Sequence, residues 1–141
     1  MSVDRVTPEA RSRNMVRVRG KDTKLELEAR RSVFAAGFRY RLHAKELPGR
    51  PDLVLPRYRT AVFVHGCFWH GHDCKKGKRP ASNTDFWNWK LDRNIARDRE
   101  KLDELKATGW TTFVVWQCSL KDDVSRLVRQ LEAQRSNELT R

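Results

Sequence analysis

The chain has 141 residues, of which 38% are hydrophobic and 34% charged, and it carries a formal net charge of +12. This length is typical of one domain, and the apolar content suffices for one core, so an intrinsically disordered chain is excluded. The positive charge predicts an anionic partner, and a long polyanion fits it better than a small metabolite. A membrane surface is the alternative, but no run approaches the roughly 18 apolar residues of a spanning helix. The N-terminus lacks the apolar stretch of a secretory signal, so a cytoplasmic protein is expected.

The N-terminal part combines a basic segment with a predicted helix. Residues 1–21 show no hydrophobic periodicity, and their charge alone would make them a solvated tail. A helix is predicted for residues 24–36, because Thr23 and Glu26 have the spacing of a capping box and Gly37 stands where a C-terminal glycine belongs.

Three strands are predicted next. Apolar and polar side chains alternate over residues 38–43, as in a half-buried strand. After a turn at residues 48–51, two apolar segments, residues 52–55 and 61–64, predict further strands. Residues 65–83 have no regular pattern and contain mainly histidine, cysteine, glycine and basic residues.

The C-terminal half predicts a helix, a strand and a helix. Thr84 is a suitable cap for a long helix over residues 85–108, which Gly109 ends. A buried strand over residues 111–116 follows, and a last helix begins at Asp122. The order of elements predicts an α/β domain with a mixed central sheet flanked by helices.

Histidines and cysteines cluster in the segment HGCFWHGHDC, which begins at His65. An odd number of cysteines in a chain expected to remain reduced favours metal ligation over disulfide bonds. Cys67, His72 and Cys74, joined by the distant Cys118, form a Cys₃His set typical of a closed, structural zinc site. The alternative is three inert thiols with surface histidines. Because four protein ligands leave no open position, catalysis would have to occur elsewhere.

Acidic and basic side chains that could hydrolyse a phosphodiester also occur in the chain. Asp52 begins a strand, and the following strand ends at His65. His70 follows five residues later, and Glu26 lies on the first predicted helix. Hydrolysis needs a hard cation held by a carboxylate, a base that activates water, and cationic help on the phosphate. The alternative is that Asp52 belongs to a turn and Glu26 only completes the capping box.

Five motifs carry a resemblance to a known family: RSRNMVRVRGKDT, LPGRPDLVLPRYR, VFVHGCFWHGHDC, TDFWNWKLDRNIARDRE and GWTTFVVWQCSL. Over about residues 11–120 the chain resembles the very short patch repair (Vsr) endonucleases. HGCFWHGHDC with a downstream WQC is highly specific, whereas PGRPD alone would be weak. The resemblance implies the restriction-endonuclease-like fold, with its core of helix, three strands, helix and strand.

The resemblance also implies catalytic roles. Asp52 would hold a catalytic magnesium ion with the main-chain carbonyl of Val64, while Glu26 would organise metal-bound water. His70 would be the base that activates water. The family pattern has a threonine in place of Val64, where a main-chain ligand survives the change but a hydroxyl contact does not.

Further roles follow from the same resemblance. His65, paired with Asp98, would contact the phosphate. The unbroken histidine run of the family is interrupted here by Gly71 and Asp73. The implied ligands of structural zinc are Cys67, His72, Cys74 and Cys118.

The implied DNA contacts come from two segments. Phe68 and Trp69 would wedge between base pairs from one groove, although composition alone would make them packed core residues. Met15 would enter from the other groove, so residues 1–21 become a DNA-contacting arm ahead of a single endonuclease domain, residues 22–141. The basic residues of this arm are Arg11, Arg13, Arg17 and Arg19.

The resemblance implies a monomeric, magnesium-dependent endonuclease that nicks one strand 5′ to the thymine of a T:G mismatch. It implies a nucleoid-associated protein with a functional link to a cytosine-5 DNA methyltransferase and to mismatch-repair proteins. Two alternatives remain: a nuclease of the same fold in a restriction-modification system, and a zinc-stabilised DNA-binding module without catalysis.

Overall fold

The computed structural model describes residues 23–139. Its helices are α2 (Lys24–Ala35), α3 (Thr84–Ala107) and α4 (Leu120–Leu139), and its strands are β1 (Arg41–Leu42), β2 (Leu53–Leu55), β3 (Thr60–His65) and β4 (Thr111–Trp116). Short 3₁₀ helices occupy Pro56–Tyr58, Lys75–Gly77 and Gln117–Ser119. The predicted order of helix, three strands, helix, strand and helix is therefore confirmed. No helix in this part of the chain is long and apolar enough to cross a membrane.

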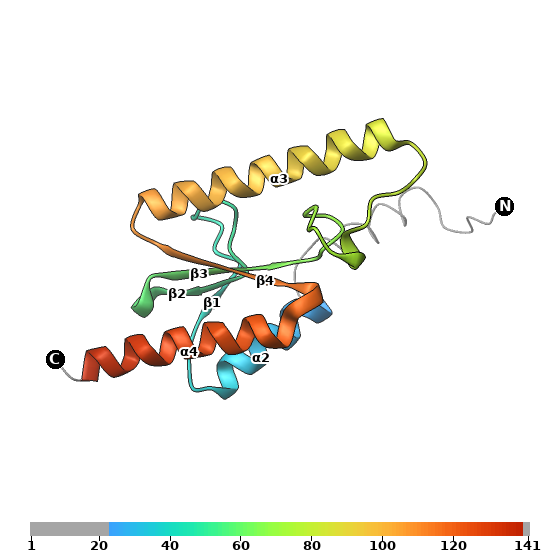
Figure 1. The fold of residues 1–141 in the computed structure, drawn as a ribbon. Helices are drawn as coiled ribbons and strands as arrows, with labels where there is room; N and C mark the ends of the chain where they lie inside the picture. Colours follow the sequence, from blue (N-terminus) through green and yellow to red (C-terminus); the bar gives the residue numbers. More distant parts are fainter. Residues whose placement is uncertain (1–22, 140–141) are drawn as a thin grey trace, which may run out of the picture.

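The four strands form one mixed sheet in the order β1-β2-β3-β4. β2 pairs antiparallel with β1 and β3, whereas β3 and β4 are parallel and are connected through α3. α3 covers one face of the sheet, and α2 and α4 lie together against the other (Figure 1). The ends of the parallel strands β3 and β4 therefore lie together, at His65 and Trp116.

Each face of the sheet has its own hydrophobic core. Val62 of β3 packs into the core beneath α2 and α4, together with Leu53, Val115 and Leu127. The adjacent Ala61 and Phe63 pack with Leu105 of α3 on the opposite face. This alternation is expected of a central strand that is covered on both sides.

The predicted start of the first strand was wrong, because a backbone N–H group expected to pair within the sheet bonds to the end of the preceding helix. Only Arg41–Leu42 of the strand predicted at residues 38–43 pairs with a neighbour. The N–H of Phe38 donates instead to the Val33 carbonyl (3.3 Å) and completes the C-terminal cap of α2, where Gly37 has a φ of +94°. Phe38 therefore belongs to the end of the helix.

The starts of the other two helices also differ from the prediction. Thr84 lies within α3, and Asn83 precedes it in the left-handed conformation without a side-chain cap. α4 begins at Leu120, two residues before Asp122. Its early start is held by Asp123, which accepts hydrogen bonds from the Trp116 N–H and the Ser119 hydroxyl (2.8 Å each).

Candidate active site and metal centre

Asp52 lies where β2 begins, beside the end of β3. Its Oδ2 accepts a hydrogen bond from the main-chain N–H of Val64 (2.7 Å), so the backbone of Val64 is next to the carboxylate. Burial raises the pKa of Asp52 from 3.8 to about 6; the Val64 N–H opposes this shift, and the nearby carboxylate of Glu26 adds to it. The fold thus holds two carboxylates close together in a desolvated position, as expected where a cation is to be bound.

Glu26 faces this site from α2 and is only 2% exposed. Its N–H donates to the Thr23 hydroxyl (3.2 Å), as a helix cap requires. Its carboxylate, however, bonds to His43 Nε2 (2.6 Å) and Arg30 Nη1 (3.3 Å). Glu26 therefore does more than cap the helix.

His43 was not among the predicted site residues. One potential ligand atom from each of Glu26, His43 and Asp52 lies within 4.8 Å of the others. The apolar–polar alternation of residues 38–43 predicted only a solvent-facing histidine. The register of β1 against β2, which places His43 across from Asp52, is not visible in the sequence.

The second group is formed by His65, His70 and Asp98, whose potential ligand atoms also lie within 4.8 Å of one another. The predicted pairing of His65 with Asp98 is not observed as a hydrogen bond. Asp98 Oδ2 instead lies 2.6 Å from His70 Nδ1. The His70 ring also stacks on the His65 ring, with centroids 3.6 Å apart and planes at 1°.

The two stacked histidines differ in their burial and in their hydrogen-bond partners. His65 is 5% exposed, and burial lowers its pKa to about 3, with the neighbouring His70 adding to the shift. Its Nδ1 has no hydrogen-bond partner among the residues that the structure describes. His65 is therefore neutral at neutral pH, whereas His70 Nδ1 contacts the Asp98 carboxylate.

Cys67, His72, Cys74 and Cys118 come together at the ends of β3 and β4, with one potential ligand atom from each within 4.8 Å of the others. His72 Nδ1 is 3.4 Å from Cys118 Sγ, close to the roughly 3.6 Å edge of a tetrahedral zinc site with usual bond lengths. Burial raises the pKa of Cys67 to about 12. Burial also acts to raise the pKa of Cys74, but hydrogen bonds with His72 and Cys67 outweigh it and lower that pKa to about 7. The donor set and its spacing fit zinc.

Trp116 connects the Cys/His group with the histidine pair. Its ring stacks on His72 (centroids 3.9 Å apart) and meets His65 edge-on (5.2 Å). Between these groups, Gly71 has a φ of +61°, and a Cβ there would lie 2.5 Å from Ile95 of α3. A larger residue at position 71 would have to displace the Ile95 side chain.

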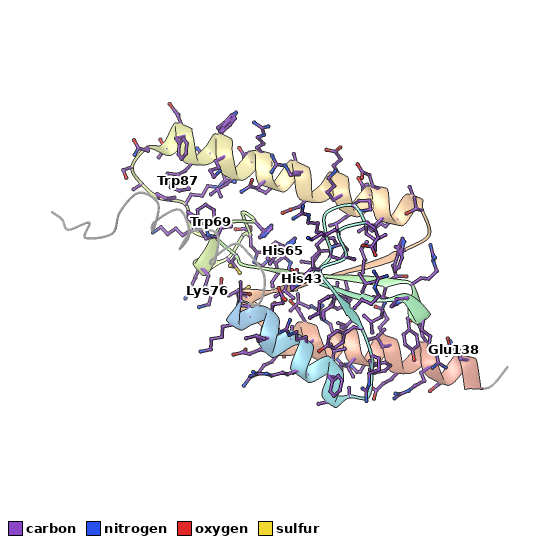
Figure 2. The ribbon with its side chains drawn as sticks, turned by 180° about the vertical axis from the view of Figure 1, so that it is seen from behind. His43, His65, Trp69, Lys76, Trp87 and Glu138 are labelled. Carbon is purple, nitrogen blue, oxygen red and sulfur yellow. The ribbon has the colours of Figure 1, made fainter. Side chains whose placement is uncertain are left out.

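Phe68 and Trp69 form an aromatic cluster with Trp87, which was not among the predicted site residues. Trp87 lies near the start of α3, opposite Trp69 on the loop (Figure 2), with ring centroids 6.0 Å apart. Its ring is 5.4 Å from that of Phe68. All three are partly exposed. The predicted DNA contacts at Met15 and the arginines of the arm lie outside the described residues.

Comparisons with known proteins identify relatives of this chain. The family described as DNA mismatch endonuclease Vsr matches residues 3–76. The type II nicking enzyme V.XorIIP of Xanthomonas oryzae is 50% identical over 84% of this chain and 88% of its own length. The type II nicking enzyme V.NmeAIP of Neisseria meningitidis is 44% identical over 92% and 96%. The DNA mismatch endonuclease Vsr of Escherichia coli is 40% identical over 79% and 71%.

Proposed function

Because the chain belongs to the DNA mismatch endonuclease (Vsr) family and is therefore a DNA nicking endonuclease, we propose that it nicks one strand 5′ to the thymine of a T:G mismatch. The reaction would depend on magnesium at Asp52, and the Cys/His group would hold zinc. The observation that carries the proposal is the placement of the Asp52 carboxylate beside the main chain of Val64, the residue directly before His65, whose ring stacks on that of His70. A binding module without catalysis would need none of these groups.

Each residue of the site would have its own role in the reaction. Asp52 and the main-chain carbonyl of Val64 would hold the cation, with Glu26 close to them. When bound, magnesium would stabilise the negative charge that develops on the phosphate. His70 would take a proton from the attacking water, and Asp98 would orient its ring and stabilise the resulting positive charge. Neutral His65 would donate a hydrogen bond toward the phosphate.

Phe68, Trp69 and Trp87 would form the wedge that opens the base stack. Their contacts hold one another in place, so little side-chain freedom remains to be lost on insertion. Unstacking a base step costs a few kcal/mol and is least costly at a mispair. A preformed wedge therefore favours mismatched over matched DNA. The arm of residues 1–21, with Met15, would contribute from the opposite groove.

A second candidate is a nicking enzyme that serves a restriction-modification system. Both of the most extensive matches described above are named type II nicking enzymes. The two candidates share the reaction and differ in the DNA context that surrounds the target. In either case a cytosine-5 methyltransferase would create the bases whose deamination produces the mismatch, and the enzyme would act as a monomer.

Matched duplexes that differ in one base pair test the proposed target. The T:G duplex should be nicked in Mg²⁺ on its thymine strand, 5′ to the mispaired base, while the C:G duplex remains intact. Replacing Phe68 and Trp69 by alanine should weaken binding of the T:G duplex at least about tenfold more than binding of the C:G duplex, because only the mispair makes insertion favourable. Cleavage of both duplexes at equal rates would contradict the proposed specificity.

Zinc content tests the proposed structural metal. The purified chain should contain about one zinc ion, and Cys118→Ser should lose it and melt at a clearly lower temperature, because the loop is no longer joined to the end of β4. Asp73→Asn is the matched control: this exposed residue lies between two of the ligands in sequence and should keep zinc and stability. A Cys118→Ser variant with full zinc content and unchanged melting would exclude this ligand set.

A further inference from the structure

His43 forms the shortest contact to Glu26, and neither the predicted site nor the comparisons assign it a role. Its Nε2 lies 2.6 Å from Glu26 Oε2, and its side chain is 16% exposed. Figure 2 labels it near the centre of the molecule, between the sheet and α2. The Arg30 guanidinium bonds to the same carboxylate oxygen.

The backbone around His43 is specialised. It directly follows β1, and its N–H donates to the main-chain carbonyl of Asp52 (3.1 Å). Its φ of +49° is left-handed, a conformation uncommon for residues other than glycine. One residue is thus joined to Asp52 through its backbone and to Glu26 through its ring. A strained conformation of this kind persists only where surrounding contacts fix it, and such positions concentrate at functional sites.

Charge compensation alone does not explain the contact. Arg30 is one helical turn from Glu26 and already places a permanent cation 3.3 Å from the same oxygen, Oε2. What His43 adds is direction, because its Nε2 approaches that oxygen from the β1–β2 connection, beside Asp52. With Oε2 engaged by both partners, the other carboxylate oxygen of Glu26 is oriented by the same contacts.

We propose that His43 is a positioning residue, which holds Glu26 so that its carboxylate is directed at the cation site beside Asp52. The inference rests on the proposed function of Asp52. Outer partners of metal-site carboxylates typically contribute 10–100-fold to metal affinity or activity. Losing the His43 contact should therefore weaken cation binding and slow nicking, without affecting the zinc group.

Substitutions that separate backbone from side chain test this role. His43→Asn tolerates the left-handed backbone, but its amide is too short to reach Glu26. His43→Gln places an amide nitrogen close to the position of Nε2. Two quantities would be measured in the full-length, zinc-loaded protein. Electron paramagnetic resonance would give the affinity for Mn²⁺, and single-turnover kinetics in Mg²⁺ would give the rate of nicking. We expect both to fall about 10–100-fold in the asparagine variant and to return to within a few-fold of wild type in the glutamine variant.

The control is Glu46→Gln, an exposed carboxylate in the same connection that pairs with Arg41, and it should leave both quantities unchanged. Should the asparagine variant not fold, His43→Gly removes the ring and relieves the left-handed backbone. The role of His43 would be overturned if the asparagine or glycine variant had the Mn²⁺ affinity and nicking rate of wild type. It would also be overturned if a folded glutamine variant were as impaired as the asparagine variant. Asp52→Asn in the same titration separates the two proposals: if it still binds Mn²⁺ and nicks, the proposed function of Asp52 fails.

Discussion

Asp52→Asn should abolish nicking and at the same time stabilise the protein in the absence of divalent cations. Asparagine can still accept the hydrogen bond from the Val64 N–H, so the local structure should persist. It has no charge to hold a magnesium ion, and nicking should therefore be lost at every accessible pH. DNA binding should remain, since a negative charge close to the phosphate has been removed.

The gain in stability follows from the raised pKa of Asp52. A pKa of about 6 in the folded protein, against 3.8 as the ordinary value, means that the ionised carboxylate costs on the order of 1–3 kcal/mol at neutral pH. Between pH 4 and pH 6 the folded chain retains a proton that the unfolded chain has released. Wild-type stability should therefore fall as pH rises through this window, and the asparagine variant should lack that component.

Thermal unfolding of the zinc-loaded protein from pH 4 to pH 8, without added divalent cations, would measure this difference. Asp103→Asn, at an exposed position on α3, is the matched change of charge and should alter neither nicking nor the pH dependence. An Asp52→Asn variant that nicks at a rate near that of wild type would remove Asp52 from the catalytic site.

His70→Ala should slow nicking by about 10²–10⁴-fold, the usual contribution of a positioned base. The remaining activity should rise with pH, because hydroxide substitutes for the missing base. Asp98→Asn should cause a smaller loss, since the ring of His70 remains stacked on His65 but loses its carboxylate partner. Single-turnover rates from pH 6 to pH 9 would measure both effects.

Zinc content separates this role from metal ligation. His72, which lies 3.4 Å from Cys118 Sγ, is the expected ligand, so His70→Ala should retain its zinc and its affinity for DNA. Loss of zinc together with activity would instead make His70 a ligand and His72 the candidate base.

Much of the fold could be predicted from periodicity and local signals. The strand predicted at residues 111–116 and the helix predicted over 85–108 correspond closely in position to β4 and α3. Both are long, regular patterns that end at glycine or at polar residues. The predicted burial of the strand was wrong, because β4 lies at the edge of the sheet and only its Val115 is fully buried. The first strand could not be predicted correctly, because the N–H of Phe38 is used by the end of α2 and the pairing of Arg41–Leu42 depends on a distant partner.

In the candidate site, too, local sequence patterns predict some features, whereas others depend on contacts between distant parts of the chain. Ligand types at metal-binding spacing identified the Cys/His group, and the structure brings its four members together. The role of His43 depends on the register of β1 against β2, which composition does not reveal. The partner of Asp98 depends on which histidine ring faces α3, and Trp87 joins the aromatic cluster only because the loop folds back on that helix.

The acidic group at Asp52 and the Cys/His group at Cys118 are proposed to be separate metal sites, one catalytic and one structural. The most direct test is to monitor Mn²⁺ binding to the zinc-loaded protein by electron paramagnetic resonance and to quantify zinc in the same samples. Wild type should bind Mn²⁺ beside one retained zinc ion, and Asp52→Asn should lose the Mn²⁺ while keeping the zinc. Equal Mn²⁺ binding by both proteins, or loss of zinc in the asparagine variant, would contradict this account.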